Sequence, residues 1–168
     1  MDTADLVRYN HTVRDLYLKA IQRLPWAEVV KPRGLSFESA RNVFLHLTVV
    51  EDRWVNYILP NRFCDWKDPD FDGFDGIESL KRYADATKKN TEAFLQSLTP
   101  ESWSRKVALP WENYEPGSQV TVETAFTHMV MEDMIHYGEL SAMMWQMNFE
   151  APYLAYCRYK LAQDDVRR

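Results

Sequence analysis

The stretch FTHMVMEDMIHYGELSAMMWQ, from Phe126 to Gln146, places three side chains that commonly bind metals at helical spacing. His128, Glu132 and His136 follow one another at four-residue intervals, so each neighbouring pair rises about 6 Å along a helix and turns by only about 40°. Two imidazoles and a carboxylate suit zinc and other divalent metals. The two histidines lie about 12 Å apart along the axis, so all three residues cannot easily share one ion. Spacing alone therefore predicts a metal site in which Glu132 acts with one of the two histidines.

A further donor is expected on a second helix, where His46 adjoins an apolar face. Two ligands from one helix and one from its neighbour would fix the geometry of the site before a metal arrives. The alternative interpretation is a core histidine satisfied by hydrogen bonds, beside an ordinary Glu–His pair on a helix surface. Glu132 is expected among apolar side chains, where an unpaired carboxylate would be costly. These neighbours are Val130, Met131, Ile135, Leu140, Met143 and Met144. From spacing and burial, both interpretations stay open.

Four long helices are expected to position these side chains. Apolar residues at helical spacing predict helices over residues 3–24, from 36 to just before Pro60, from 75 to about 98, and onward from 121. Ser36 is the expected N-cap of the second helix, and Asp75 with Glu78 forms an expected capping box for the third. Thr121 is the expected N-cap of the fourth helix, which contains the stretch quoted above.

The connections between the helices complete the predicted architecture. The loop NRFCDWKDPDFDGFDG, residues 61–76, is long enough for a crossover rather than a tight helical hairpin. Two short runs, Lys106–Leu109 and Gln119–Val122, flank a Pro-Gly turn and predict a small β-hairpin. A short C-terminal helix is expected with Pro152 in its first turn. The sequence therefore predicts an all-α four-helix bundle with long crossover connections, a small hairpin before the fourth long helix and a short terminal helix.

Length and composition limit the class of protein. The 168 residues fit a single domain, predicted to span residues 1–168, and a content of 46% hydrophobic and 27% charged residues is typical of globular chains. A net charge of −5 offers no basic face for nucleic acid. The two cysteines, Cys64 and Cys157, form no CxxC pattern, which argues against a disulfide scaffold or a thiolate zinc cluster. No signal peptide or membrane span is predicted, so we expect a soluble cytoplasmic protein.

Two segments together resemble a known family. FLHLTVVEDRW carries His46 in the middle of the second helix, and HMVMEDMIHYGEL carries the stretch from His128 to Leu140. In this order they are similar to the DinB/YfiT-like superfamily of metal-binding four-helix bundles, and the similarity covers nearly the whole chain. The resemblance implies that His46, Glu132 and His136 are the metal ligands. His128 then lies close to the site without being a ligand.

The resemblance also implies an activity. Glu132 stands where many members carry a third histidine, and it looks like the variant found in mycothiol-dependent maleylpyruvate isomerases, although no counterpart of their additional C-terminal domain is present. Members with known activity use the metal to activate low-molecular-weight thiols such as mycothiol or bacillithiol. The expected function is thus metal-dependent transfer of a small thiol to an electrophile. Zinc is the expected metal, with nickel, iron or manganese as alternatives.

Other functions compatible with the same residues are a metal-dependent hydrolase and a non-catalytic module for metal binding, stress response or dimerisation. The expected partners are a small-molecule thiol and an electrophile, without nucleic acid or membrane, and the resemblance suggests a homodimer. Asp133 is a candidate for orienting a ligand imidazole. Arg14 and Arg53 are expected either to meet an anionic thiol or to form surface ion pairs. His11 has no evident partner, and we expect it to be exposed.

Overall fold

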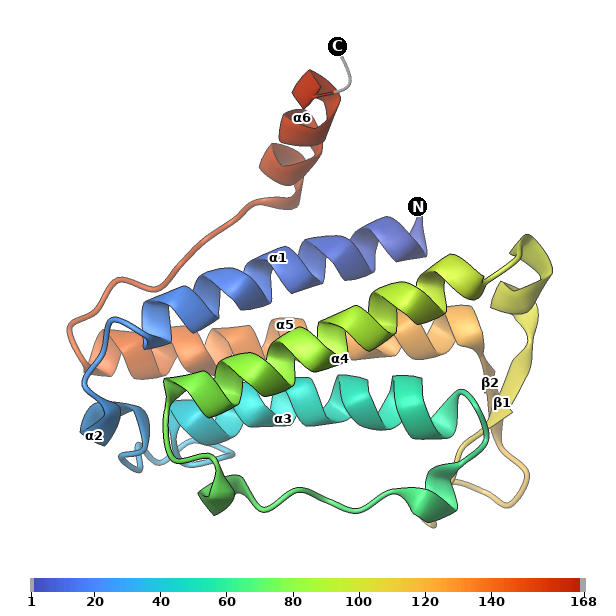
Figure 1. Cartoon of the computed structure of the whole chain (residues 1–168), viewed down its shortest axis with the longest axis horizontal. Helices are drawn as coiled ribbons and strands as arrows, with labels where there is room; N and C mark the ends of the chain where they lie inside the picture. The colour runs from blue at the N-terminus through green and yellow to red at the C-terminus, as the bar shows by residue number, and fades with distance from the viewer. Residues whose placement is uncertain (1, 167–168) are drawn as a thin grey trace.

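The computed structural model contains four long helices packed side by side as a bundle, with a β-hairpin at one end (Figure 1). It describes residues 2–166; Met1, Arg167 and Arg168, which the predicted domain also includes, lie outside the described residues. The all-α bundle predicted from the sequence is confirmed. The long helices are α1 Thr3–Ile21, α3 Ala40–Arg53, α4 Ile77–Ser97 and α5 Val122–Gln146.

A long crossover joins the second and third of these helices, as predicted. α3 and α4 run in the same direction, and the chain between them returns along the length of the bundle (Figure 1). This return contains only short helical turns, and a further short helix lies between α1 and α3. These elements are α2 Trp26–Val29, the π-helical turn η1 Trp54–Ile58, and the 3₁₀ turns η2 Phe63–Asp65 and η3 Phe71–Gly73.

The N-cap predicted for the fourth long helix is confirmed, whereas the one predicted for the second is wrong. Thr121 accepts a hydrogen bond from the Thr124 backbone N–H and caps α5. For α3 the cap is Ser39, not Ser36. Glu38 has a φ of 64°, so the chain is still turning through the left-handed region two residues after Ser36. The helix therefore begins only after this turn is complete.

The third long helix also begins differently from the prediction. α4 has Gly76 as its N-cap, and the Ser79 hydroxyl donates to the Gly76 carbonyl oxygen at 2.6 Å. The expected capping box of Asp75 and Glu78 is therefore wrong by one residue. Such shifts are common, because neighbouring polar residues can serve as caps equally well and the packing of the helix selects among them.

The predicted hairpin is confirmed. β1 Lys106–Ala108 pairs antiparallel with β2 Gln119–Thr121, and Val107 lies opposite Val120. Along the chain, this hairpin lies between the 3₁₀ helix η4 Pro100–Ser104 and α5. It covers the end of the bundle at which α3 finishes and α5 begins (Figure 1). Gly117 has a φ of 85° in the connecting turn, a conformation that glycine adopts at little cost.

The C-terminal helix begins later than predicted. α6 spans Tyr156–Val166, and Pro152 lies in the extended segment before it rather than in its first turn. The Tyr9 hydroxyl on α1 donates to the Leu154 carbonyl oxygen at 2.7 Å and holds this segment extended along α1. α6 then projects away from the four long helices (Figure 1).

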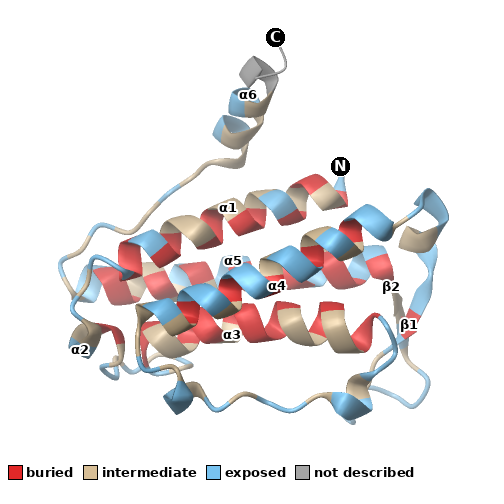
Figure 2. Cartoon of the chain, in the orientation of Figure 1, coloured by how far each residue is buried: buried red, intermediate tan, exposed pale blue. Residues whose placement is uncertain are grey.

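Buried residues face the middle of the bundle on all four long helices (Figure 2). The apolar core forms two clusters, one toward α2 and one under the hairpin. The first contains Phe44 and Leu140, and the second contains Trp54 and Phe126. Among the described helices, none combines the length and apolar character that crossing a membrane requires.

A network of buried charged groups lies at the centre of the bundle. Glu51 of α3 forms an ion pair with Arg14 of α1 and accepts a hydrogen bond from Thr91 of α4. The His11 Nε2 atom lies 2.8 Å from Glu51 Oε1. Our expectation that His11 is exposed is therefore wrong: its side chain is only 2% exposed. Arg14 is buried as well, so it forms neither a surface ion pair nor a contact for an external anion.

Asp133 completes this network from α5. Its Oδ2 atom accepts from the Asn10 amide at 2.6 Å and lies 3.3 Å from an Arg14 guanidinium nitrogen. Burial raises the pKa of Asp133 to about 6, although Arg14 acts in the opposite direction. Because Glu51 already balances the charge of Arg14, a second ionised carboxylate is less favourable here.

We expect the stability contributed by Glu51 to disappear in acid. Burial alone would raise its pKa, but the charges of Arg14 and then His11 outweigh burial and hold the pKa well below the ordinary 4.5. A carboxyl with a lowered folded pKa stabilises the fold fully above pH 4.5, and this contribution is lost as the pH falls further. Glu51→Gln should therefore lower the free energy of unfolding by about 1.5–3 kcal/mol at pH 7, and by progressively less below pH 4.5.

Urea unfolding with EDTA, measured from pH 7 to pH 3, would follow this difference. Asp15→Asn is the control, because Asp15 of α1 also forms an ion pair with another helix, through Lys88 of α4, but at the surface. A Glu51→Gln deficit that stays constant over the whole pH range would contradict the assignment of an ionised, stabilising Glu51.

Candidate metal centre

His46, Glu132 and His136 converge between α3 and α5. One potential ligand atom from each lies within 4.8 Å of those of the other two, and all three residues are half-buried. The rings of His46 and His136 have centroids 4.6 Å apart and lie nearly perpendicular. One ligand thus comes from α3 and two from successive turns of α5, because residues four apart share a helix face.

Glu132 sits between two histidines. Its Oε1 atom lies 3.2 Å from His46 Nε2, and its Oε2 atom lies 3.2 Å from His128 Nε2. Hydrogen bonds to His128 and then to His46 lower the pKa of Glu132 well below its ordinary value. The carboxylate is therefore ionised at neutral pH, which is the form that binds a metal. His128 has a half-exposed side chain and stands beside the cluster of three rather than within it.

Glu139 orients His136. The Oε2 atom of Glu139 lies 2.7 Å from His136 Nδ1 and accepts a hydrogen bond from the Ser36 hydroxyl at 2.8 Å. Because Nδ1 is engaged, Nε2 of His136 is the nitrogen left for a metal, and a carboxylate behind a ligand imidazole is the usual supporting arrangement. Burial would raise the pKa of Glu139, but the hydrogen bonds to His136 and Ser36 outweigh it and keep the pKa low.

The sequence analysis assigned this supporting role to Asp133, whereas the structure places Asp133 in the buried network with Arg14 and Asn10. The signal for Glu139 was present in the sequence. It follows His136 by three residues, which puts the two side chains on the same face of a helix.

Phe37 covers one side of the cluster and was not anticipated. Its ring stacks on His46 with a centroid distance of 4.0 Å and meets the edge of His136 at 5.4 Å. Phe37 lies in the turn before α3, where no periodic pattern points to a buried or functional position. The same turn supplies Ser36, so the segment that displaced the predicted start of the helix also helps to enclose the site.

The environment of Glu132 is more open than predicted. Val130, Leu140, Met143 and Met144 are buried as expected, but Met131 and Ile135 are 64% and 70% exposed. These two residues lie on the outer face of α5, whose buried face packs against α1 and α3. Glu132 therefore sits at the edge of the core, where ionisation costs less than among apolar side chains.

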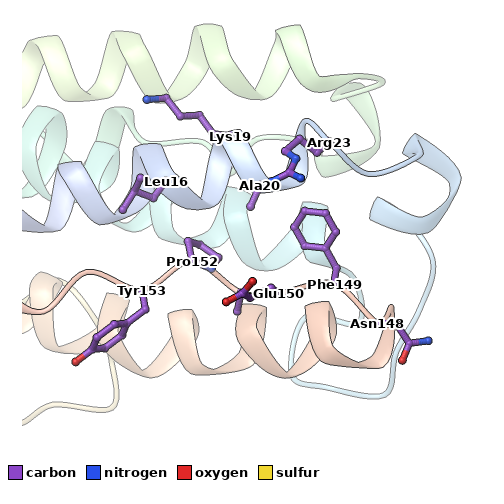
Figure 3. A pocket seen from close by; sticks show the side chains of 10 residues that line it. Leu16, Lys19, Ala20, Arg23, Asn148, Phe149, Glu150, Pro152 and Tyr153 are labelled. Atoms are coloured by element: carbon purple, nitrogen blue, oxygen red, sulfur yellow. The ribbon is translucent and has the colours of Figure 1, made fainter.

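A cavity lies on another part of the molecule, away from His46, Glu132 and His136. It has a volume of about 560 Å³ and lies between α1 and the segment that follows α5, as Figure 3 shows. Its lining includes Lys19 and Arg23, and the Arg23 guanidinium lies 5.2 Å over the Phe149 ring. None of its lining residues belongs to the cluster of His46, Glu132 and His136. The volume of a cavity therefore does not locate the candidate metal site, whereas the potential ligand atoms of His46, Glu132 and His136 do.

The cluster fits a divalent metal by the chemistry of its donors. Two imidazoles and one ionised carboxylate are a ligand set of catalytic zinc sites, and the same set suits non-haem iron. Such sites keep positions free for water or substrate, and the partial exposure of all three residues is compatible with this. The cysteines do not contribute, because Cys64 and Cys157 are both exposed and free.

Comparisons with known proteins identify the family and the fold of the chain. The sequence model of the DinB family matches residues 1–166. Among solved structures, the crystal structure of a DinB-like protein from Bacillus subtilis is similar with a TM-score of 0.64 and 19% sequence identity. The similarity covers 88% of this chain and 96% of that one, and at this identity it establishes the fold. The search of curated proteins gives no match.

Proposed function

The chain belongs to the DinB family, whose members generally bind metals, and from this membership we propose that it is a metal-dependent enzyme that transfers a low-molecular-weight thiol to an electrophile. The observation that supports the proposal is the convergence of His46, Glu132 and His136 at a partly exposed position. Glu139 supports it as well, because it engages Nδ1 of His136 and leaves Nε2 for a metal.

The residues of the chain have distinct roles in this proposal. His46 and His136 hold a divalent metal through imidazole nitrogens, and Glu132 holds it through a carboxylate oxygen and offsets its charge. When bound, the metal would lower the pKa of the thiol, so that a thiolate would be present near neutral pH. Glu139 fixes the orientation of His136, and Phe37 limits the access of water from one side.

In the proposed transfer the thiol releases its S–H proton to solvent water, and a bond forms between its sulfur and a carbon of the electrophile. The leaving group departs from that carbon with the bonding electrons. Of the two arginines considered from the sequence, Arg14 is buried and committed to Glu51, so it does not bind an anionic thiol. The Arg53 guanidinium lies 5.5 Å over the Trp111 ring, a contact that leaves its N–H donors available to an anion.

The test is metal-dependent formation of a thioether. The native protein, with and without one equivalent of zinc, nickel, iron or manganese, is incubated at pH 7 with bacillithiol or mycothiol and an aryl or benzyl halide. A thiol of pKa about 8.5 is only about 3% ionised at this pH, so complete ionisation is expected to accelerate the reaction by about 10- to 30-fold.

Glu132→Gln should abolish this acceleration, while Asp85→Asn, which alters an exposed carboxylate paired with Lys81, should not. Equal rates with and without every metal would refute the transferase. Metal binding without turnover would favour the alternative, a non-catalytic metal-binding module.

A further inference from the structure

A small apolar cavity lies beside the metal cluster, at the end of the bundle covered by the hairpin. Its volume is about 140 Å³. Trp54 at the end of α3 forms one wall, and Leu109 and Val120 of the hairpin region form another. Ala125 and His128 of α5 complete the lining together with Thr124 and Tyr114. Three separate parts of the chain thus meet around one space.

The walls of this cavity are fixed by their own packing. Trp54 is 2% exposed and Ala125 is 1% exposed. The Trp54 ring contacts the Trp111 ring edge-on with a centroid distance of 5.3 Å, and the Arg53 guanidinium lies over the same Trp111 ring. A ring held in this way offers a flat apolar surface to a ligand without having to be ordered on binding.

The size of the cavity selects its ligand. A cavity of about 150 Å³ lined by apolar side chains is large enough to bind benzene. The cavity under the hairpin has nearly this volume and opens to solvent beside Tyr114, Thr124 and His128. One six-membered aromatic ring therefore fills it, whereas a fused two-ring system would extend out of it. The indole of Trp54 favours an aromatic ligand over an aliphatic one, because edge-to-face contacts between rings add to the burial of apolar surface.

His128 connects this cavity to the metal cluster. It lines the cavity, its ring centroid lies 5.9 Å from that of Trp54, and its Nε2 atom lies 3.2 Å from Glu132 Oε2. Only one side chain therefore separates the space under the hairpin from a residue of the cluster. The cavity and Glu132 therefore share His128 as a neighbour.

We propose that this cavity binds a single aromatic ring of the electrophile, so that the substrates are small benzyl or aryl compounds. The identity of the bound molecule as the electrophile rests on the proposed function. Binding of the ring itself rests only on the shape and lining of the cavity and requires no metal.

Toluene is the probe for this cavity. It is titrated into metal-free native protein while the methyl signals of Val120 and Ala125 are followed by ¹³C NMR. For a ligand of seven heavy atoms we expect saturable shifts of both methyl groups with a Kd on the order of 1 mM. 1-Methylnaphthalene, which has two fused rings, should leave these signals unchanged.

A matched pair of variants on α5 locates the binding. Thr124→Leu adds bulk at an exposed position that lines the cavity and should weaken toluene binding by at least about 10-fold. Thr127→Leu makes the same change three residues further along the helix, outside the lining, and should leave the Kd unchanged. The absence of saturable shifts in the native protein, or equal binding by Thr124→Leu, would overturn the proposal.

Failure of this inference is distinguishable from failure of the proposed function. If metal-dependent thioether formation is observed but toluene does not bind, the cavity proposal is wrong and the transferase stands. If toluene binds and no metal promotes the transfer, the aromatic site stands and its assignment to an electrophile is wrong. When both succeed, Thr124→Leu should lower kcat/KM for benzyl chloride by about 10-fold and leave that for iodomethane unchanged.

Discussion

Replacing Arg14 by methionine is expected to lower the free energy of unfolding by about 3–5 kcal/mol, because it removes one partner of a buried ion pair. Arg14 lies between Glu51 and Asp133, and the side chains of all three are less than a tenth exposed. Burial alone would lower the pKa of Arg14, yet the two carboxylates raise it above its ordinary value. Without the guanidinium, Glu51 would remain in the core with only His11 and Thr91 as partners.

Arg8→Met is the matched control for this prediction. It is the same substitution on the same helix, but Arg8 pairs with Glu92 at the surface, where an ion pair contributes less than about 1 kcal/mol. The double variant Arg14→Met/Glu51→Leu should recover part of the lost stability, because Asp133, which keeps the Asn10 amide as a partner, is then the one carboxylate of this network left without its cation. Urea denaturation of the four proteins measures these differences. Equal effects of Arg14→Met and Arg8→Met would show that the buried network contributes little.

Replacing His136 by alanine is expected to weaken metal binding by more than about 100-fold. Loss of a group that merely orients a ligand already costs about 10- to 100-fold in affinity, and His136 is assigned as a ligand itself. The fold should survive, because His136 lies at the edge of the core and is not part of the Arg14 network. Competition with a chromophoric chelator gives the affinity for zinc, and plasma mass spectrometry gives the metal content of the purified protein.

Two further variants make this result specific. Glu139→Gln keeps the shape of the group that holds His136 Nδ1 and should weaken binding by about 10-fold or more. His128→Ala should retain the metal, because His128 contacts Glu132 from outside the cluster of three. A loss in His128→Ala as large as that in His136→Ala would instead assign His128 as the ligand. Native protein that takes up neither zinc nor nickel would contradict the metal centre altogether.

Much of the fold follows from local sequence. Helical spacing of apolar residues located all four long helices, and the long polar loop before α4 indicated the crossover. The flanking strands and their Pro-Gly turn located the hairpin, since turn chemistry and alternation act over a few residues. The spacing of Glu132 and His136 placed both on one face of α5, because this depends only on the geometry of a helix. These features were predictable since each is decided within a single segment.

Other features, such as the partners of a side chain and its exposure, depend on which segments pack against a helix in the folded chain. His11 and Arg14 have no partner nearby in sequence, and only the packing of α1 against α3 and α5 brings them to Glu51 and Asp133. In the same way, periodicity marked Met131 as apolar without showing that its side of α5 is exposed. The periodicity of a helix determines which of its side chains share a face, but it does not determine which face is buried in the bundle.

The metal cluster combines both kinds of information. The sequence by itself determined that Glu132 and His136 share a helix face and, with the family resemblance, that His46 joins them. The place of Glu139 beside His136 also follows from local spacing, because the two residues are three apart on α5. Tertiary structure alone brought Ser36 and Phe37 to their places around Glu139, His136 and His46. It also placed His128 between Glu132 and a cavity formed by three segments of the chain. The presence of Glu132 and a histidine on one helix face is a matter of local spacing, whereas the enclosure of the candidate site and the access to it arise where separate segments meet. The sequence specifies these only through the complete packed fold.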